Sequence, residues 1–265
     1  MAVKYREIIS AINEIAPPEL AQDWDNCGTQ VYTGKEYIEK VLVCLEVTNA
    51  VIDEAEKLGV DFILTHHPLL FSPMRKVDNN EFIGSLIVEL IKNEISVYSA
   101  HTNFDTVLGG NNTKLCEILG LRVIGRLIGA NESPERTIGR IAEFKEPISL
   151  DAAAKLVQDK LDLPPQSIRI VGEKDRMIKR VGVCTGAGAD LMNHCLTNNC
   201  DAFITGDVKY HDAQHAKEMN LAVIDAGHFG TEYIFSDNMA TQLRKKIHDV
   251  EIIVSKANVD PFTYI

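Results

Sequence analysis

The stretch VLVCLEVTNAVIDEAEKLGVDFILTHH, residues 41–67, decides the fold. It opens with an apolar run interrupted only by Glu46, which is typical of a strand that is buried on both faces of a sheet. Thr48 can cap the helix that follows, and Gly59 can end it. The apolar segment 62–64 then predicts a second buried strand. A strand, a helix and another strand in this order predict a βαβ unit with parallel strands.

The same alternation recurs further along the chain. Helices expected at 82–92 and 211–219 are followed by the apolar segments 95–100 and 221–225, which predict strands. The segment 202–205 predicts one more buried strand. We therefore expect a layered α/β protein whose helices cover its sheets.

A change in composition divides the chain into domains. Residues 122–146 are polar and contain glycine, and NESPE at 131–135 indicates a loop, so we place a boundary near 125. The helix and strand expected after residue 231 are predicted to return to the first domain, because chain ends commonly pack near each other. The expected domains are residues 1–125 together with 226–265, and residues 126–225.

Composition argues against several classes of protein. Among 265 residues, 27 Lys and Arg face 38 Asp and Glu, which gives a net charge of −11 and no basic footprint for a nucleic acid. No apolar run approaches the roughly 20 residues that a membrane span needs. The start MAVKYREIISAINE carries charges throughout and does not predict a secretory signal. We therefore expect a cytoplasmic protein that binds neither nucleic acid nor membrane.

Potential metal ligands follow two of the expected strands directly. His66 and His67 come after the strand at 62–64, and His101 and Asp105 come after the next strand. In open α/β sheets, ligands bind outside the carboxyl ends of the strands. A lone histidine at a strand end is more often a hydrogen-bonded structural residue, but repeated clusters after successive strands favour a metal site.

A third cluster follows the strand at 221–225, where His228 and Glu232 lie four residues apart and can share one helical face. Imidazole and carboxylate ligands suit Zn, Fe, Mn, Co or Ni better than Ca or Mg. Three histidines and two carboxylates cannot saturate two metals, so water would complete the coordination, as in a catalytic site.

Three further features each admit two interpretations. His211 is either a substrate-facing group or a surface histidine. The segment TGAGAD, residues 185–190, either wraps a phosphate or forms a tight turn. Trp24, the sole tryptophan, stands in DWDNCG and either stacks a base or packs in the core.

The motifs THHPLLF, AHTNFD, TGDVKYHDAQHA and DAGHFGTE, together with WDNCG near the start, resemble the GTP cyclohydrolase I type 2 homologue family of dinuclear-metal-centre hexameric proteins. The resemblance runs over nearly the whole chain. It implies two similar three-layer α/β/α domains around a dinuclear metal site, and a toroidal homohexamer. The implied ligands of the two divalent ions are His66, His67, Asp105, His228 and Glu232.

The resemblance also implies a reaction, in which metal-activated water opens the imidazole ring of GTP at C8 and gives formate and a dihydroneopterin triphosphate. His101 or His211 would then move protons, because imidazole titrates in the right range. Residues 185–188 and Lys209 are candidate partners of the triphosphate. Two alternatives stay open, namely a dinuclear hydrolase of another substrate and a hexameric metal-binding adaptor without enzymatic activity.

Overall fold

A computed structural model describes residues 2–129 and 136–265, and the loop expected at 131–135 lies outside the described residues. The chain divides into two compact units, and each is described by itself. Unit 1 comprises Met1–Val107 and Phe235–Val259, and unit 2 comprises Leu108–Ile234 and Asp260–Ile265.

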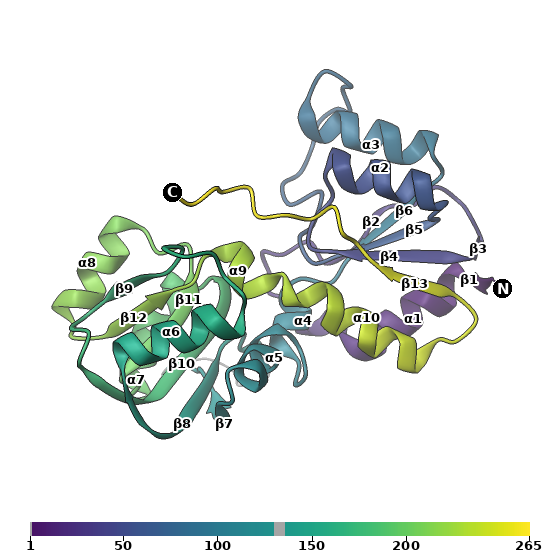
Figure 1. The fold of residues 1–265 in the computed structure, drawn as a ribbon. Coiled ribbons are helices and arrows are strands. Elements are labelled where there is room, and N and C mark those ends of the chain that lie inside the picture. Colours follow the sequence, from purple (N-terminus) through teal and green to yellow (C-terminus); the bar gives the residue numbers. More distant parts are fainter. Residues whose placement is uncertain (1, 130–135) are drawn as a thin grey trace. The chain divides into compact units, whose positions relative to one another are not determined.

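Unit 1 contains a five-stranded sheet in the order β13-β4-β5-β6-β2. Its strands are parallel except β2, which runs antiparallel to β6. Helices α2 and α3 cover one face, and α1 and α10 cover the other (Figure 1). The strands are β2 (Gly28–Val31), β4 (Lys40–Cys44), β5 (Phe62–Thr65), β6 (Ser96–Ser99) and β13 (Glu251–Val254). The helices are α1 (Tyr5–Ile15), α2 (Asn49–Leu58), α3 (Phe82–Lys92), α4 (Thr102–Thr106) and α10 (Ile234–Lys246), with the short elements β1 (Val3–Lys4), η1 (Pro18–Leu20) and β3 (Tyr37–Ile38).

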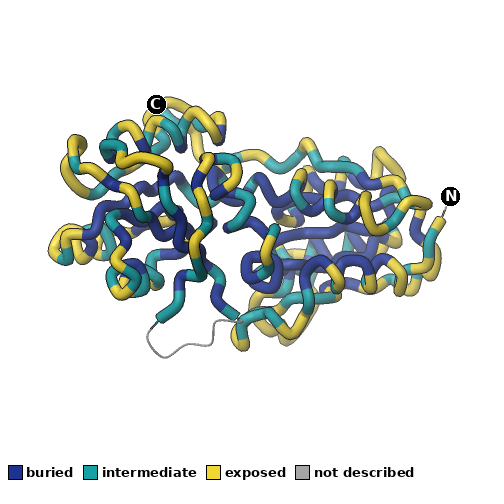
Figure 2. The backbone as a smooth tube through the Cα atoms, turned by 90° about the horizontal axis from the view of Figure 1, so that it is seen from below, coloured by how far each residue is buried: buried dark blue, intermediate teal, exposed yellow. Residues whose placement is uncertain are grey.

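The apolar strand sequences explain the layers of unit 1. Leu42 and Ile63 point to the face where Val51 of α2 and Leu86 of α3 pack. All four residues of β5 are buried, as a strand covered on both faces requires. Figure 2 shows buried segments of the backbone in dark blue and exposed segments in yellow. Thr48 caps α2 by accepting a hydrogen bond from Val51 N, and the helix ends as the sequence predicts.

Unit 2 contains a six-stranded sheet in the order β7-β8-β10-β11-β12-β9, in which β10, β11 and β12 are mutually parallel and the other pairings are antiparallel. The strands are β7 (Arg122–Arg126), β8 (Arg140–Ser149), β9 (Arg169–Val171), β10 (Met177–Ala187), β11 (Ala202–Gly206) and β12 (Ala222–Asp225). The helices are α5 (Asn111–Ile118), α6 (Leu150–Lys160), η3 (Ala189–Leu191), α7 (Met192–Thr197), α8 (Tyr210–Glu218) and α9 (His228–Glu232).

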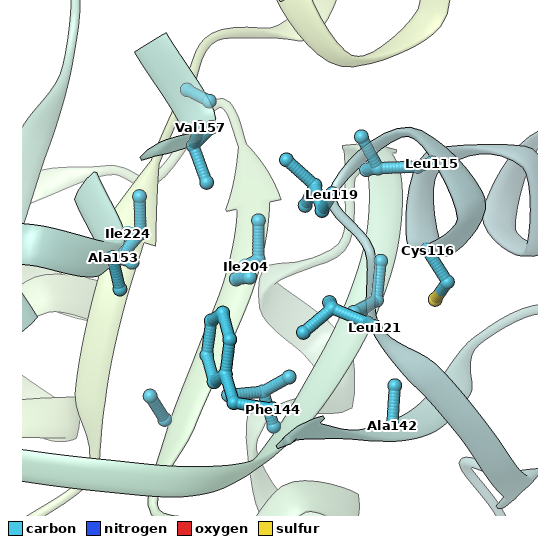
Figure 3. Close-up of a cluster of buried hydrophobic side chains, with 14 of the residues drawn as sticks. Leu115, Cys116, Leu119, Leu121, Ala142, Phe144, Ala153, Val157, Ile204 and Ile224 are labelled. Carbon is cyan, nitrogen blue, oxygen red and sulfur yellow. The ribbon is translucent and has the colours of Figure 1, made fainter. Parts of the chain in front are cut away.

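Helices cover both faces of the unit 2 sheet. On one face, side chains from α5 and α6, among them Leu115 and Val157, surround Phe144 and Ile204 (Figure 3). On the other face, Cys195 of α7 and residues of α8 pack in a separate cluster. Both units are therefore three-layer α/β/α structures, and the predicted fold class is confirmed.

The units change over at residues 107/108 and 234/235, whereas the sequence predicts boundaries near 125 and 225. Unit 2 begins before the predicted boundary near 125 because Leu115 and Leu119 belong to its core. The polar stretch 122–146 also differs from expectation, since it contributes β7 and part of β8. The strand predicted at the C-terminal end does pair with β4 of unit 1, but residues 260–265 lie with unit 2.

The two sheets share a pattern of hydrogen bonds between the starts of neighbouring parallel strands. Asp61 N donates to Lys40 O at 3.2 Å in unit 1, and Asp201 N donates to Arg180 O at 2.7 Å in unit 2. The Asp61 carboxylate also accepts from the N–H groups of Glu39 and Lys40, and the Asp201 carboxylate accepts from those of Lys179 and Arg180, just before β10 begins to pair with β11. In each unit, the aspartate just before one parallel strand therefore forms hydrogen bonds to the neighbouring parallel strand.

No helix among the described residues is both long enough and apolar enough to cross a membrane.

Replacing Asp61 with alanine is expected to lower the free energy of unfolding by about 2 kcal/mol, because the N–H groups at the start of β4 lose their acceptor and Lys35 loses its 2.5 Å ion pair. Denaturant unfolding followed by circular dichroism measures the change. Asp53→Ala, at an exposed position of α2, is the control and should stay within about 0.5 kcal/mol of the starting protein. Equal stability of the two variants would contradict the proposed role of this contact.

Candidate metal centre

Three histidines lie together at the ends of neighbouring strands in unit 1. His66 and His67 directly follow β5, and His101 comes two residues after the end of β6. β5 and β6 are parallel and pair Thr65 with Ser99, so the segments that follow both strands leave the sheet at the same edge. The ring centroids of His66 and His101 are 5.0 Å apart, and those of His67 and His101 are 5.7 Å apart.

The donor atoms of this cluster are close enough to share an ion. One ring nitrogen from each of His66, His67 and His101 lies within 4.8 Å of the others. Asp105 on α4 adds a carboxylate whose Oδ2 is 3.6 Å from His66 Nε2. Imidazole with carboxylate suits the first-row divalent metals. The described residues of unit 1 thus fit a metal ion.

Hydrogen bonds on Nδ1 orient two of these three rings. His66 Nδ1 is 2.9 Å from Ala100 O. A carbonyl oxygen only accepts, so Nδ1 carries a hydrogen, and in the neutral ring Nε2 is the nitrogen that can bind a metal. His101 Nδ1 is likewise 2.9 Å from Asp25 Oδ1. Metal-binding histidines are commonly held by such bonds on the opposite ring nitrogen.

Asp25 also belongs to this centre, although it was not among the predicted site residues. Its side chain is fully buried and also accepts hydrogen bonds from Thr102 N and from Cys27 Sγ. Burial favours the neutral acid, but the hydrogen bonds from His101, Cys27 and Thr102 hold the pKa of Asp25 well below its usual range. Asp25 is therefore an ionised acceptor for the His101 ring. The turn signature DWDNCG is the sequence signal that points to this segment.

Unit 2 carries a second group of donors on α9. His228 Nε2 lies 2.9 Å from Glu232 Oε2, and His228 Nδ1 lies 2.7 Å from Asp207 Oδ2. Burial disfavours the charged imidazole, but these two carboxylates raise the pKa of His228 to about 9. The pair therefore favours a positive charge at this position. Asp207, at the end of the TGD sequence, was not among the predicted site residues.

The TGAGAD segment places glycine against the Glu232 carboxylate. Gly186 has φ +65°, and a Cβ there would lie 2.1 Å from Glu232 Oε1. Gly186 N donates to Thr231 Oγ1 at 2.9 Å, and Gly188 N donates to Thr205 Oγ1 at 3.0 Å. Because these N–H groups already have acceptors, the structure supports a tight turn here over a phosphate-binding loop.

The other predicted functional residues of unit 2 lie on or beside α8. His211 is exposed and packs edge-on against Tyr210, with ring centroids 5.3 Å apart. It belongs to none of the metal-competent donor groups found among the described residues. Lys209 is exposed immediately before the helix. Of the two predicted catalytic histidines, only His101 lies with candidate ligands.

Sequence comparison identifies relatives along the whole chain. The family model described as Duf34/NIF3 (NGG1p interacting factor 3) matches residues 3–261. A Clostridium perfringens protein called GTP cyclohydrolase 1 type 2 homolog is 37% identical over 267 residues, which cover 99% of this chain and all of that protein. A Clostridium acetobutylicum protein of the same name is 35% identical over the full length of both.

Solved structures agree with this relationship. The Staphylococcus aureus protein SA1388 superposes with a TM-score of 0.90 at 27% identity, over 99% of each chain. HcgD from Methanocaldococcus jannaschii superposes with a TM-score of 0.80 at 30% identity, over 96% of this chain and 98% of that one. The resemblance found from the motifs is thereby confirmed, and the chain belongs to the Duf34/NIF3 family.

Proposed function

We propose that this protein is a metal-dependent hydrolase that opens the imidazole ring of GTP at C8, releasing formate and a dihydroneopterin triphosphate. The observation that carries the proposal is the cluster of three imidazoles in unit 1, in which donor atoms of two proposed ligands, His66 and His67, lie within 4.8 Å of a ring nitrogen of the proposed proton carrier, His101. The name GTP cyclohydrolase 1 type 2 homolog, given to relatives matched over their full length, supports the choice of substrate.

The proposed ligands of two divalent ions are His66, His67, Asp105, His228 and Glu232, and the proposed metals are Zn, Fe, Mn, Co or Ni. When bound, such ions polarise the substrate and lower the pKa of water toward about 7. Neighbouring residues position two of the proposed metal ligands. Ala100 O fixes the orientation of the His66 ring, and Gly186 leaves room for the Glu232 carboxylate.

His101 is the favoured proton carrier, because Asp25 holds its Nδ1–H and leaves Nε2 as the atom that exchanges a proton. His211 remains a second candidate from the sequence. Lys209 is the proposed cationic partner of the triphosphate, since its side chain is exposed. We also propose that the protein is a cytoplasmic homohexamer.

A second candidate function is metal-dependent binding of a protein partner without catalysis. The family description supports it, because it names an interacting factor of NGG1p. A hydrolase of another substrate is the third possibility. A panel of nucleotides, phosphodiesters and cyclic amides separates the two enzymes, and partner capture that is lost on chelation would favour the binding protein.

Glu232→Gln is expected to abolish formate release from GTP by the metal-loaded protein, since it removes the charge of a proposed ligand while nearly keeping its shape. Mass spectrometry of formate, with and without a chelator, measures turnover, and size-exclusion chromatography checks the assembly. Glu218→Gln, the same change on the exposed surface of α8, is the control. Unchanged turnover in Glu232→Gln would contradict the proposed reaction.

Metal affinity is expected to rise with pH up to about 9, because the proton on His228 must leave before that ring binds an ion. Below this pKa the apparent affinity should fall by up to about tenfold per pH unit. Calorimetric titration of metal-free protein with Zn²⁺, in buffers of different ionisation enthalpy, counts the released protons. Asp207→Asn should lower the pKa of His228 and release fewer protons near pH 7, whereas the exposed Asp159→Asn should not. Metal affinity independent of pH in this range would contradict the assignment of His228.

Asp25→Asn is expected to release the fixed tautomer of His101 and to lower formate release by about 10- to 100-fold, as loss of an orienting partner commonly does. Imidazole ¹⁵N chemical shifts report the tautomer directly. His66 is an internal control, because its Nδ1–H is held by a backbone carbonyl. Asp23→Asn, at an exposed position of the same segment, is the matched variant. An unchanged His101 signal in Asp25→Asn would rule out this positioning role.

A further inference from the structure

Two aromatic side chains of unit 1 are exposed beside the imidazole cluster. Trp24 is 60% exposed and Phe71 is 54% exposed, so the core role considered for Trp24 is not the one that the structure shows. Their ring centroids are 6.1 Å apart, with an interplanar angle of 60°. Trp24 also meets the His101 ring edge-on, at a centroid distance of 6.2 Å. We call Trp24 and Phe71 the aromatic platform.

The backbone under the platform is tied down by hydrogen bonds. Asn26 Nδ2 donates to Leu70 O at 2.6 Å, and Leu70 N donates to Gln30 Oε1 at 3.0 Å. Gln30 Nε2 in turn donates to Asn26 O at 2.7 Å. These three bonds join the segment that carries Trp24 to the segment that carries Phe71. The buried Asp25 then anchors the first segment to the residue after His101.

We propose that the aromatic platform binds the flat heteroaromatic ring of the substrate by stacking. Aromatic faces receive rings of this kind with little regard for their substituents. The platform adjoins His101, so a ring held there lies beside the candidate metal ligands of unit 1. The identification of this ring as a purine rests on the proposed function, but the stacking itself requires only a planar heterocycle.

The sole tryptophan provides a direct readout, because Trp24 is the only source of indole fluorescence. Full-length protein freed of metal by chelation is titrated with GTP and with guanosine, under excitation that the bases do not absorb. Both ligands are expected to quench the fluorescence saturably. Tripolyphosphate and ribose 5-phosphate, which carry no aromatic ring, should leave it unchanged. Equal quenching by tripolyphosphate would overturn the proposal.

Substitution tests the second aromatic side chain. Phe71→Ala should weaken guanosine binding about tenfold, as loss of one stacking partner does. Phe82→Ala removes a similarly exposed phenylalanine at the start of α3 and should bind normally. Trp24→Ala should lose binding in equilibrium dialysis, and Trp24→Phe should recover part of it.

The outcomes separate this proposal from the proposed reaction. Ring binding without formate release in the metal-loaded protein would support the aromatic platform and contradict the proposed cyclohydrolase activity. Formate release with no quenching by any ring-bearing ligand would contradict the aromatic platform and support the proposed cyclohydrolase activity. A smaller assembly for Trp24→Ala in size-exclusion chromatography, with guanosine binding unaffected by Phe71→Ala, would show that the aromatic side chains face another copy of the chain, which also overturns the proposal.

Discussion

The parallel register of β5 and β6 determines where the imidazoles of unit 1 lie. Ala100 N donates to Thr65 O at 2.9 Å, and Ala100 O accepts from His66 Nδ1 at the same distance. One residue therefore joins the end of β6 both to the sheet and to a potential metal ligand. Because the first of these bonds involves only backbone atoms, the chemistry of this edge depends on which side chains follow the strands.

Unit 2 has the corresponding backbone hydrogen bond at its strand ends, but different residues follow it. Ala226 N donates to Thr205 O at 2.9 Å, which matches the bond between Ala100 and Thr65. The next residues in unit 2 are Gly206 and Gly227, and a Cβ on Gly206 would lie 2.5 Å from the carbonyl carbon of Gly227. Close backbone contact thus replaces two of the imidazoles of unit 1. The donors of unit 2 come one residue later, from Asp207 and from the first residue of α9.

Local sequence predicts the parallel strands and the residues that end them, because each strand is a short apolar run and each donor follows closely. His66 and His67 end a segment whose own pattern also predicts β5. Asp25 lies in an irregular loop and meets a histidine 76 residues away, so only the tertiary fold brings the two together. The edge strand β7 and its neighbour β8 were missed. No residue of β7 is fully buried and the second half of β8 is largely exposed, so this stretch lacks the continuous apolar run of a buried strand.

Charge constrains how such a protein can recognise a nucleotide. The net charge of −11 attracts cations and repels a triphosphate. The carboxylates of Asp25 and Glu232 add to this negative field beside the imidazoles of His101 and His228. A purine ring carries no net charge, so stacking on Trp24 is not opposed by this field. For the proposed substrate, affinity must therefore come from the ring and from bound cations more than from contacts between the acidic chain and phosphate.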